Sequence, residues 1–169
     1  LVPDFMIRAG IRNLCKKRLQ QCQADDCEAN AELAEKYIKE SDASPMAVLT
    51  EKANQQHYEV PAEFYRYALG KNYKYSCCYY DSKNDSLDQA EDRALALTCE
   101  HANLENGLDI LELGCGWGSL SLWMARHFPK SKIISISNSN SQREYIIGQA
   151  RSRGLENLTV YTEDINEFE

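Results

Sequence analysis

The feature that most constrains the fold is a short apolar run, Leu108 to Leu113, that stops abruptly at three closely spaced glycines. The glycines lie in the stretch Glu112-Leu113-Gly114-Cys115-Gly116-Trp117-Gly118, and Ser119 to Phe128 then has the pattern of a helix. A buried parallel strand reads as such an apolar run, and the glycine turn returns the chain as a helix. The sequence therefore predicts an α/β fold in this region.

The residues that follow continue the alternation of strand and helix. Lys132 to Ile136 predicts a second strand, Ser141 to Arg153 a helix, and Leu158 with Val160 a third strand. Gly154 with Leu155 makes a plausible cap for that helix. We thus predict two parts: an all-helical extension over residues 1–104 and the first β-α-β-α-β part of a Rossmann-like domain over 105–169.

The first part has apolar residues at helical spacing. We expect helices from about Ile7 to Cys22, from Glu28 to Glu40, through the mid-fifties, and from Pro61 to Ala68. Ser86 to Gln89 has the form of a capping box, which predicts the start of another helix. Small apolar residues of the first helix, Cys15 and Cys22, are expected in the core, and His101 of the last helix at its boundary.

Composition excludes several classes of protein. The chain has 169 residues and a net charge of −7, so binding to nucleic acid through charge alone is not expected. Seven cysteines without a Cys-x-x-Cys pair indicate neither a disulfide framework nor a zinc site, and favour a reducing compartment such as the cytoplasm. No apolar run approaches the length of a transmembrane segment.

The glycine loop indicates a cofactor. Glycines let the backbone approach a ligand closely, and a helix N-terminus favours a negative group such as a carboxylate. A nicotinamide fingerprint requires a third glycine where this chain has Ser119. What remains is acid-x-Gly-x-Gly-x-Gly, the pattern associated with S-adenosylmethionine, in which Glu112 would steer the ammonium group. The alternative is a glycine turn that binds nothing.

Polar residues follow the second and third strands. No carboxylate follows Ile136 directly; instead the chain reads Ser137-Asn138-Ser139-Asn140-Ser141-Gln142, whose hydroxyl and amide groups would have to bind the ribose. The same residues also suit the N-cap of the next helix, and both roles are compatible. Asp164 and Ile165 come where adenine would lie, although Asp164 alone reads only as a helix cap.

Several of these stretches together resemble a known family. Tyr75-Ser76-Cys77, the loop from Glu112 to Gly118 and Ser137-Asn-Ser-x-x-Gln142 are similar to the cyclopropane-fatty-acid-synthase group of methyltransferases. The stretches from Thr50 to Pro61 and from Leu69 to Tyr79 resemble the plant coclaurine N-methyltransferases within that group. The resemblance covers nearly the whole chain.

The resemblance implies a class I methyltransferase fold whose helical N-terminal extension covers S-adenosylmethionine. It implies that Tyr75 and Ser76 reach the methionine end of this cofactor, with Gly114 and Gly116 below it. It assigns the ribose to Ser137, Asn138 and Gln142, and adenine to Asp164 and Ile165. Cys77 borders a bicarbonate pocket in the cyclopropane synthases, and its role here stays open.

The ends of the chain raise a further expectation. The sequence begins with Leu1 rather than Met and stops at Glu169, after the third strand. In amine-methylating relatives the catalytic Glu and His lie beyond that strand, and a three-stranded sheet leaves an unpaired edge. We therefore expect an N-terminal fragment of a longer enzyme, with unknown catalytic residues beyond Glu169, that is inactive alone.

Three functions remain open at this point. The first is transfer of a methyl group to an amine nitrogen of a small molecule, and the second is lipid methylation of the cyclopropane-synthase type. The bases of the first helix and Cys77 support the second. The third is a non-catalytic cofactor-binding or interaction module. The expected partner is an amine, or a lipid in the second case; a homodimer is left open.

Overall fold

The computed structural model describes residues 2–22, 26–47 and 61–167. Contacts divide the chain into two compact units, Leu1–Val48 and Leu49–Glu169. This division groups the helices after residue 60 with the sheet. The boundary after residue 104 separates helical from mixed secondary structure, and as a division into functional parts it stays a prediction.

The first unit contains helices α1 (Asp4–Gln21) and α2 (Cys27–Asp42). Asp26 caps α2, because its side chain accepts a hydrogen bond from the Ala29 N–H at 3.0 Å. Both helices were expected from the sequence, α1 from its apolar spacing and α2 from its many Ala, Glu and Lys residues. No residue of either is buried, so the expectation that Cys15 and Cys22 lie in a core is wrong: both are exposed.

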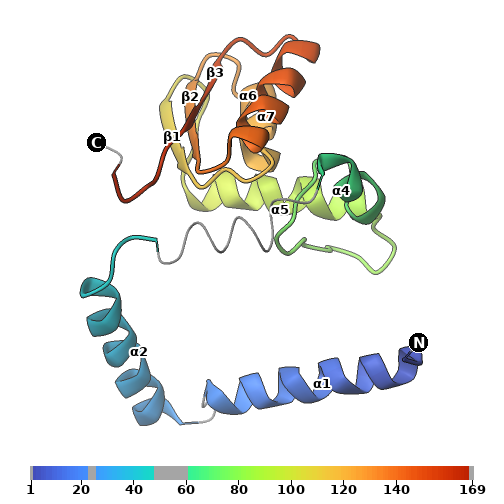
Figure 1. Cartoon of the computed structure of the whole chain (residues 1–169), viewed down its shortest axis with the longest axis vertical. Helices are drawn as coiled ribbons and strands as arrows, with labels where there is room; N and C mark the ends of the chain where they lie inside the picture. The colour runs from blue at the N-terminus through green and yellow to red at the C-terminus, as the bar shows by residue number, and fades with distance from the viewer. Residues whose placement is uncertain (1, 23–25, 48–60, 168–169) are drawn as a thin grey trace. The chain divides into compact units, whose positions relative to one another are not determined.

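The second unit contains a parallel sheet with helices (Figure 1). Its elements, in chain order, are α4 (Ala62–Ala68), α5 (Leu87–His101), β1 (Asp109–Leu113), α6 (Ser119–His127), β2 (Lys132–Ser137), α7 (Asn140–Ser152) and β3 (Leu158–Thr162). The strands lie in the order β1-β2-β3, and both neighbouring pairs are parallel. This arrangement confirms the predicted α/β class and the β-α-β-α-β order.

Local signals account for several helix ends. Pro61 precedes α4, and the capping box at α5 is present, with Ser86 and Gln89 bonded reciprocally. After α7, Gly154 has φ +65° and the Leu155 N–H donates to the Ala150 carbonyl at 2.9 Å. These ends agree with the sequence predictions. The helix expected through the mid-fifties lies outside the described residues.

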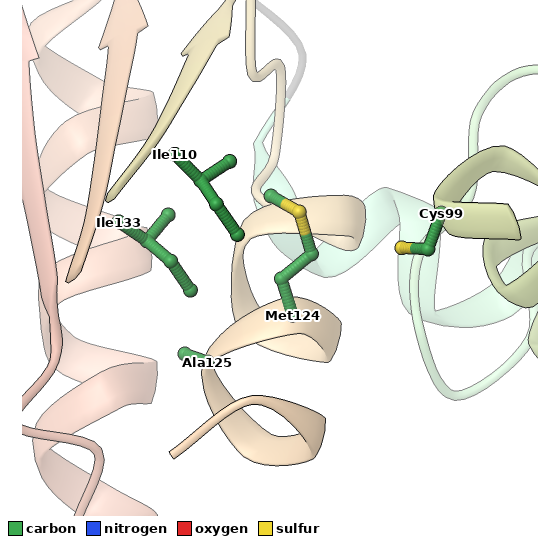
Figure 2. Close-up of a cluster of buried hydrophobic side chains, with 5 residues drawn as sticks. All are labelled: Cys99, Ile110, Met124, Ala125 and Ile133. Atoms are coloured by element: carbon green, nitrogen blue, oxygen red, sulfur yellow. The ribbon is translucent and has the colours of Figure 1, made fainter. Parts of the chain in front are cut away.

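The core lies between one face of the sheet and three helices. Ile110 of β1 and Ile133 of β2 point toward α6, where Met124 and Ala125 meet them, and Cys99 of α5 completes the cluster (Figure 2). A second cluster joins α6, α7 and β3. Burying apolar side chains of this kind contributes about 1.5–3 kcal/mol each, which fixes the sheet against its helices.

The buried side of α5 agrees only in part with the sequence prediction. The spacing places Leu87, Ala90, Ala94, Leu97, His101 and Leu104 on one side. Of these, Ala90 is buried and Leu104 packs against the core, but Leu87 is exposed, and the other buried residues of the helix are Glu91, Leu95 and Cys99. His101 is exposed, so the prediction that it borders the core is wrong. Glu91 is buried because its carboxyl group accepts hydrogen bonds from backbone N–H groups of residues 70–74.

The other face of the sheet carries apolar side chains that remain accessible. Leu111 is 52% exposed, Ile134 39% and Tyr161 46%. Strand β1 is thus buried on one face only among the described residues, although its sequence predicted burial on both. Within the same described ranges, no helix combines the length and apolar character needed to cross a membrane.

Candidate functional site

The glycine loop joins β1 to α6 through a sharply turned backbone. Gly114, Gly116 and Gly118 have φ values of +77°, +54° and +77°, a region that favours glycine. The N–H groups of Gly114 and Cys115 both donate to the Ile136 carbonyl at 3.0 Å, which ties the loop to the end of β2. The loop is therefore held by the sheet at the carboxyl ends of the strands.

The three glycines have different reasons to lack a side chain. A Cβ on Gly118 would lie 2.6 Å from the side chain of Ile146 in α7, so this glycine permits close packing of two helices. A Cβ on Gly114 or Gly116 would meet nothing within 4 Å. The backbone of these two glycines consequently faces open space, as a ligand-binding turn requires.

Glu112, at the end of β1, lies against two buried serines. Its Oε2 accepts a hydrogen bond from Ser121 Oγ of α6, and Ser135 Oγ of β2 lies 2.9 Å from the same oxygen. Burial raises the pKa of Glu112, and the hydrogen bonds from the two serines act in the opposite direction. The carboxylate is thus oriented by hydroxyl groups, and the described residues place no cation on it.

Sequence reasoning missed both serines, although one carried a signal. Ser135 interrupts the apolar run of β2 and pairs in register with Glu112 on the same face of the sheet. A fully buried hydroxyl in the middle of a strand needs a hydrogen-bond partner, and the neighbouring strand offers this carboxylate. Ser121 lies in an ordinary helical position and gave no such signal.

A cavity of about 310 Å³ lies above the loop. Five of the predicted site residues line it: Tyr75, Ser76, Glu112, Gly114 and Gly116. The structure therefore brings the 73–76 segment and the glycine loop together, although about forty residues separate them in the sequence. The remaining lining residues are Tyr73, Lys74, Leu95, Thr98, Cys115, Trp117, Ser119 and Leu120.

An aromatic cluster, which the sequence did not predict, joins these segments. Tyr65 of α4 is 3% exposed and contacts both Tyr75 and Trp117, with ring centroids 5.5 Å apart in each pair. Trp117 contacts Tyr145 of α7 at 5.4 Å, and Tyr145 stacks on Tyr73 at 5.8 Å. Such contacts stabilise by roughly 0.5–1.5 kcal/mol each, so they fix the cavity wall against the glycine loop.

The residues predicted for the ribose lie at the end of β2. Ser137 Oγ donates to Gln142 Oε1 at 2.8 Å, and both side chains are buried. Gln142 Nε2 has no hydrogen-bond partner among the described residues. Ser139 is the N-cap of α7, so capping leaves Ser137 and Gln142 available for another role, while Asn138 is exposed next to them.

Asp164 and Ile165 follow β3 and do not line the cavity above the glycine loop. Asp164 Oδ1 accepts hydrogen bonds from the Asn166 backbone N–H at 2.9 Å and from its Nδ2 at 2.8 Å. These bonds form a local turn over residues 164–167. The ten predicted residues thus form three groups. Five line the cavity, three (Ser137, Asn138 and Gln142) lie at the end of β2, and two (Asp164 and Ile165) follow β3.

Comparison with known proteins places this arrangement in a family. The chain is 37% identical, over 98% of its length, to the (S)-coclaurine N-methyltransferase of Thalictrum flavum subsp. glaucum. It is 29% identical, over 67% of its length, to the cyclopropane-fatty-acyl-phospholipid synthase of Escherichia coli strain K12, of which the match covers 28%.

A solved structure agrees over nearly the whole chain. The crystal structure of coclaurine N-methyltransferase bound to N-methylheliamine and S-adenosylhomocysteine matches 99% of this chain and 48% of its own, with a TM-score of 0.90 and 34% identity. The chain spans about half the length of the curated relatives that it matches, 46% in the Thalictrum enzyme. Residues 48–169 match the family described as mycolic acid cyclopropane synthetase, and the chain belongs to this family.

Proposed function

We propose that the whole protein transfers a methyl group from S-adenosylmethionine to an amine nitrogen of a small molecule. The observation that carries this proposal is the 37% identity with a plant coclaurine N-methyltransferase across 98% of the chain. The cavity above the glycine loop supports it, because its walls come from the segments that the cofactor pattern involves.

The residues of this site fit S-adenosylmethionine. The open space at Gly114 and Gly116 gives a ligand access to the backbone. Buried polar atoms near the loop, Trp117 Nε1, Ser119 Oγ and Gln142 Nε2, have no hydrogen-bond partner within the described part of the chain. Buried polar groups are nearly always paired in proteins, so these atoms favour a polar ligand or bound water at this place.

Each part of the cofactor has candidate residues. We assign its methionine end to Tyr75, Ser76, Glu112, Gly114 and Gly116, its ribose to Ser137, Asn138 and Gln142, and its adenine to Asp164 and Ile165. A carboxylate at the end of β1 suits an ammonium group, and the N-terminus of α6 suits a carboxylate. The carboxyl ends of parallel strands are where ligands of such folds bind.

The reaction needs little chemistry from the protein. When bound, S-adenosylmethionine supplies a methyl group that its sulfonium already activates. The chain's residues contribute position: Glu112 and the glycine loop orient the donor, and the aromatic cluster around Tyr65 holds the wall formed by Tyr75. Catalytic residues stay unassigned within this sequence, and the expectation that these 169 residues alone turn over no amine stays a prediction.

The amine must be neutral to accept a methyl group, because protonation removes its lone pair. We expect kcat/KM for a basic amine to fall tenfold per pH unit below the amine's pKa. The measurement is a pH–rate profile with two amines of different pKa, in which the fall should move with the amine. A profile that is flat for both amines would contradict transfer to nitrogen.

Gln142→Ala should weaken binding of S-adenosylhomocysteine by roughly 0.5–1.5 kcal/mol, the usual net contribution of a neutral hydrogen bond. The reason is that we assign its buried amide to the ribose, and that its Oε1 also accepts the hydrogen bond from Ser137 Oγ. Calorimetric titration measures the change. Gln149→Ala is the control, since Gln149 lies on the same helix and its side chain accepts a hydrogen bond from Arg153 at the helix end. Equal affinities for the wild type and Gln142→Ala would remove Gln142 from the ribose role.

Lipid methylation is the second candidate. The match to the Escherichia coli cyclopropane synthase favours it. A test supplies the whole protein with labelled S-adenosylmethionine and either a secondary amine such as coclaurine or phospholipid vesicles with bicarbonate. Label in the amine alone supports the proposal, and label in the lipid alone overturns it. Cofactor binding without transfer to either would favour a non-catalytic module.

Two further expectations concern the setting of the protein. All seven cysteines are free thiols, which supports a reducing compartment such as the cytoplasm. The described residues contain no cluster of three or more His, Cys, Asp and Glu side chains suited to a metal ion. Self-association as a homodimer is a separate expectation that gel filtration with light scattering would test.

A further inference from the structure

A fully buried carboxylate lies on the side of α5 that faces the segment from residue 70 to 76. Glu91 is 0% exposed, although the buried neighbours on its helix are apolar or small: Ala90, Leu95 and Cys99. Burial of a charged group is costly unless hydrogen bonds compensate it. The position of Glu91 therefore requires partners, and it did not follow from the helical spacing.

Backbone amides of one short segment satisfy Glu91. Its Oε1 accepts hydrogen bonds from the Gly70 N–H at 2.8 Å and from the Lys74 N–H at 3.3 Å. Its Oε2 accepts one from the Asn72 N–H at 2.8 Å. One carboxylate thus binds every second amide along five residues, so it fixes the course of this backbone in the way a bound anion would.

Two further acidic residues of the same helix extend this contact. Asp88 Oδ1 accepts a hydrogen bond from the Lys71 N–H at 2.8 Å. Asp92 accepts one from Asn72 Nδ2 at 2.8 Å and forms an ion pair with Lys71 Nζ at 2.5 Å. Asp88 and Asp92 are accessible to solvent where they bind residues 71 and 72. Of the three acidic residues that hold this segment, Glu91 is the one that is fully buried.

The fit at the start of the segment leaves no room for a side chain. A Cβ added to Gly70 would lie 2.7 Å from Asp88 Oδ1 and 2.8 Å from the carboxyl group of Glu91. These distances are shorter than a real Cβ contact. Gly70 is therefore needed for the close approach of this backbone to the Glu91 carboxylate, beyond any role in ending α4.

We infer that Glu91 is a positioning residue, which holds residues 70–74 so that Tyr75 and Ser76 keep their place in the cavity wall. Glu91 does not line the cavity itself, whereas the two residues that follow the anchored amides do. The effect on cofactor affinity rests on the proposed function, because Tyr75 and Ser76 are assigned there to the methionine end. The anchoring itself rests only on the hydrogen bonds.

The test compares Glu91→Gln with the wild type. Glutamine has the same shape, but its Nε2 cannot accept the N–H that one glutamate oxygen binds, so at least one buried amide loses its acceptor. Leaving such a group unpaired costs enough to weaken binding of S-adenosylhomocysteine by about tenfold. Glu100→Gln is the control, since Glu100 lies on α5, is exposed, does not line the cavity and forms an ion pair with Arg93. The affinity of this variant should match that of the wild type.

Hydrogen exchange separates positioning from a general loss of stability. In Glu91→Gln, the amides of residues 70, 72 and 74 should exchange at least tenfold faster, while those of β1 to β3 keep the wild-type rates. Gly70→Ala adds a Cβ that would press on the Glu91 and Asp88 carboxyl groups. This variant should also show faster exchange at residues 72 and 74 and weaker binding of S-adenosylhomocysteine.

Each outcome decides between the alternatives. Unchanged affinity and unchanged exchange at residues 70–74 in Glu91→Gln would overturn the inference. Faster exchange throughout the sheet would overturn it in favour of a general structural role. A wild-type protein that binds no S-adenosylhomocysteine would contradict the proposed function, and the exchange rates would then still decide whether Glu91 holds the segment.

Discussion

Gly114→Val should abolish binding of S-adenosylhomocysteine, with an affinity at least a hundredfold below that of the wild type. The valine side chain would project into the cavity, where the wild-type glycine leaves nothing within 4 Å of a Cβ. Gly114 also has φ +77°, a conformation that costs a β-branched residue roughly 1–3 kcal/mol. Calorimetric titration measures the affinity, and thermal unfolding measures the cost in stability.

Gly154→Val is a matched control that distinguishes two effects of Gly114→Val: the side chain in the cavity and the strain of a positive φ. Gly154 has φ +65° in the turn after α7, has open space around it, and does not line the cavity. Gly154→Val should therefore lose a similar amount of stability and keep the affinity of the wild type. Retained binding by a folded Gly114→Val protein would show that the glycine loop is a turn without a ligand.

Glu112→Gln should stabilise the ligand-free protein at neutral pH and weaken its cofactor binding. Burial raises the pKa of Glu112, so the folded state favours the neutral carboxyl group more than the unfolded state does. The stability that neutral Glu112 contributes is fully present below the pKa that this residue has in the unfolded state. It is lost as the pH rises through the pKa that Glu112 has in the folded state. Glutamine does not ionise, so the variant avoids that loss.

The effect on binding has the opposite sign. Glutamine removes the negative charge that we assign to the ammonium group, and hydrogen bonds between charged groups contribute about 1.5–3 kcal/mol. We thus expect S-adenosylhomocysteine to bind roughly 10- to 100-fold more weakly at pH 8. Thermal unfolding from pH 4 to 8, with and without this ligand, measures both effects.

Asp109→Asn is the control for this pair of measurements. Asp109 begins the same strand, is exposed and does not line the cavity, so its replacement removes one charge without changing the site. It should leave the affinity unchanged. A Glu112→Gln protein that is less stable than the wild type at pH 8, yet binds the ligand equally well, would contradict both roles assigned to this carboxylate.

The parts of the fold that the sequence predicted are those with local signals. The glycine loop, the capping box at Ser86 and the turn at Gly154 each depend on residues within a few positions of one another, and all three are present. The apolar runs of the three strands and their order follow in the same way, since short crossovers through a helix make parallel neighbours.

The predictions that failed depend on contacts between distant residues. The spacing of α5 included the buried residue Ala90 but left out Glu91, which is buried because amides 17 to 21 residues earlier in the chain bind it. The apolar spacing of α1 suggested a core for Cys15, yet that helix contains no buried residue. Periodicity shows which residues share a face but not what that face contacts.

The candidate site was predictable in outline for a related reason. Glu112 and the glycines form a pattern within seven residues, and Gln142 lies in the first turn of α7, shortly after the end of β2. The serines that orient Glu112 and the aromatic cluster at Tyr65 come from four helices and strands and two loops, so no local pattern contains them. Such residues become evident only when the strands and helices are assembled.

The most direct test of the account is calorimetric titration of the folded whole protein with S-adenosylhomocysteine, alongside NAD as a ligand that shares the adenosine part. The account predicts one binding site for S-adenosylhomocysteine and none for NAD, because the glycine loop has Ser119 where a nicotinamide fingerprint requires glycine. A folded protein that binds neither ligand, or that binds NAD more tightly, would contradict the assignment of the cavity to a methyl donor.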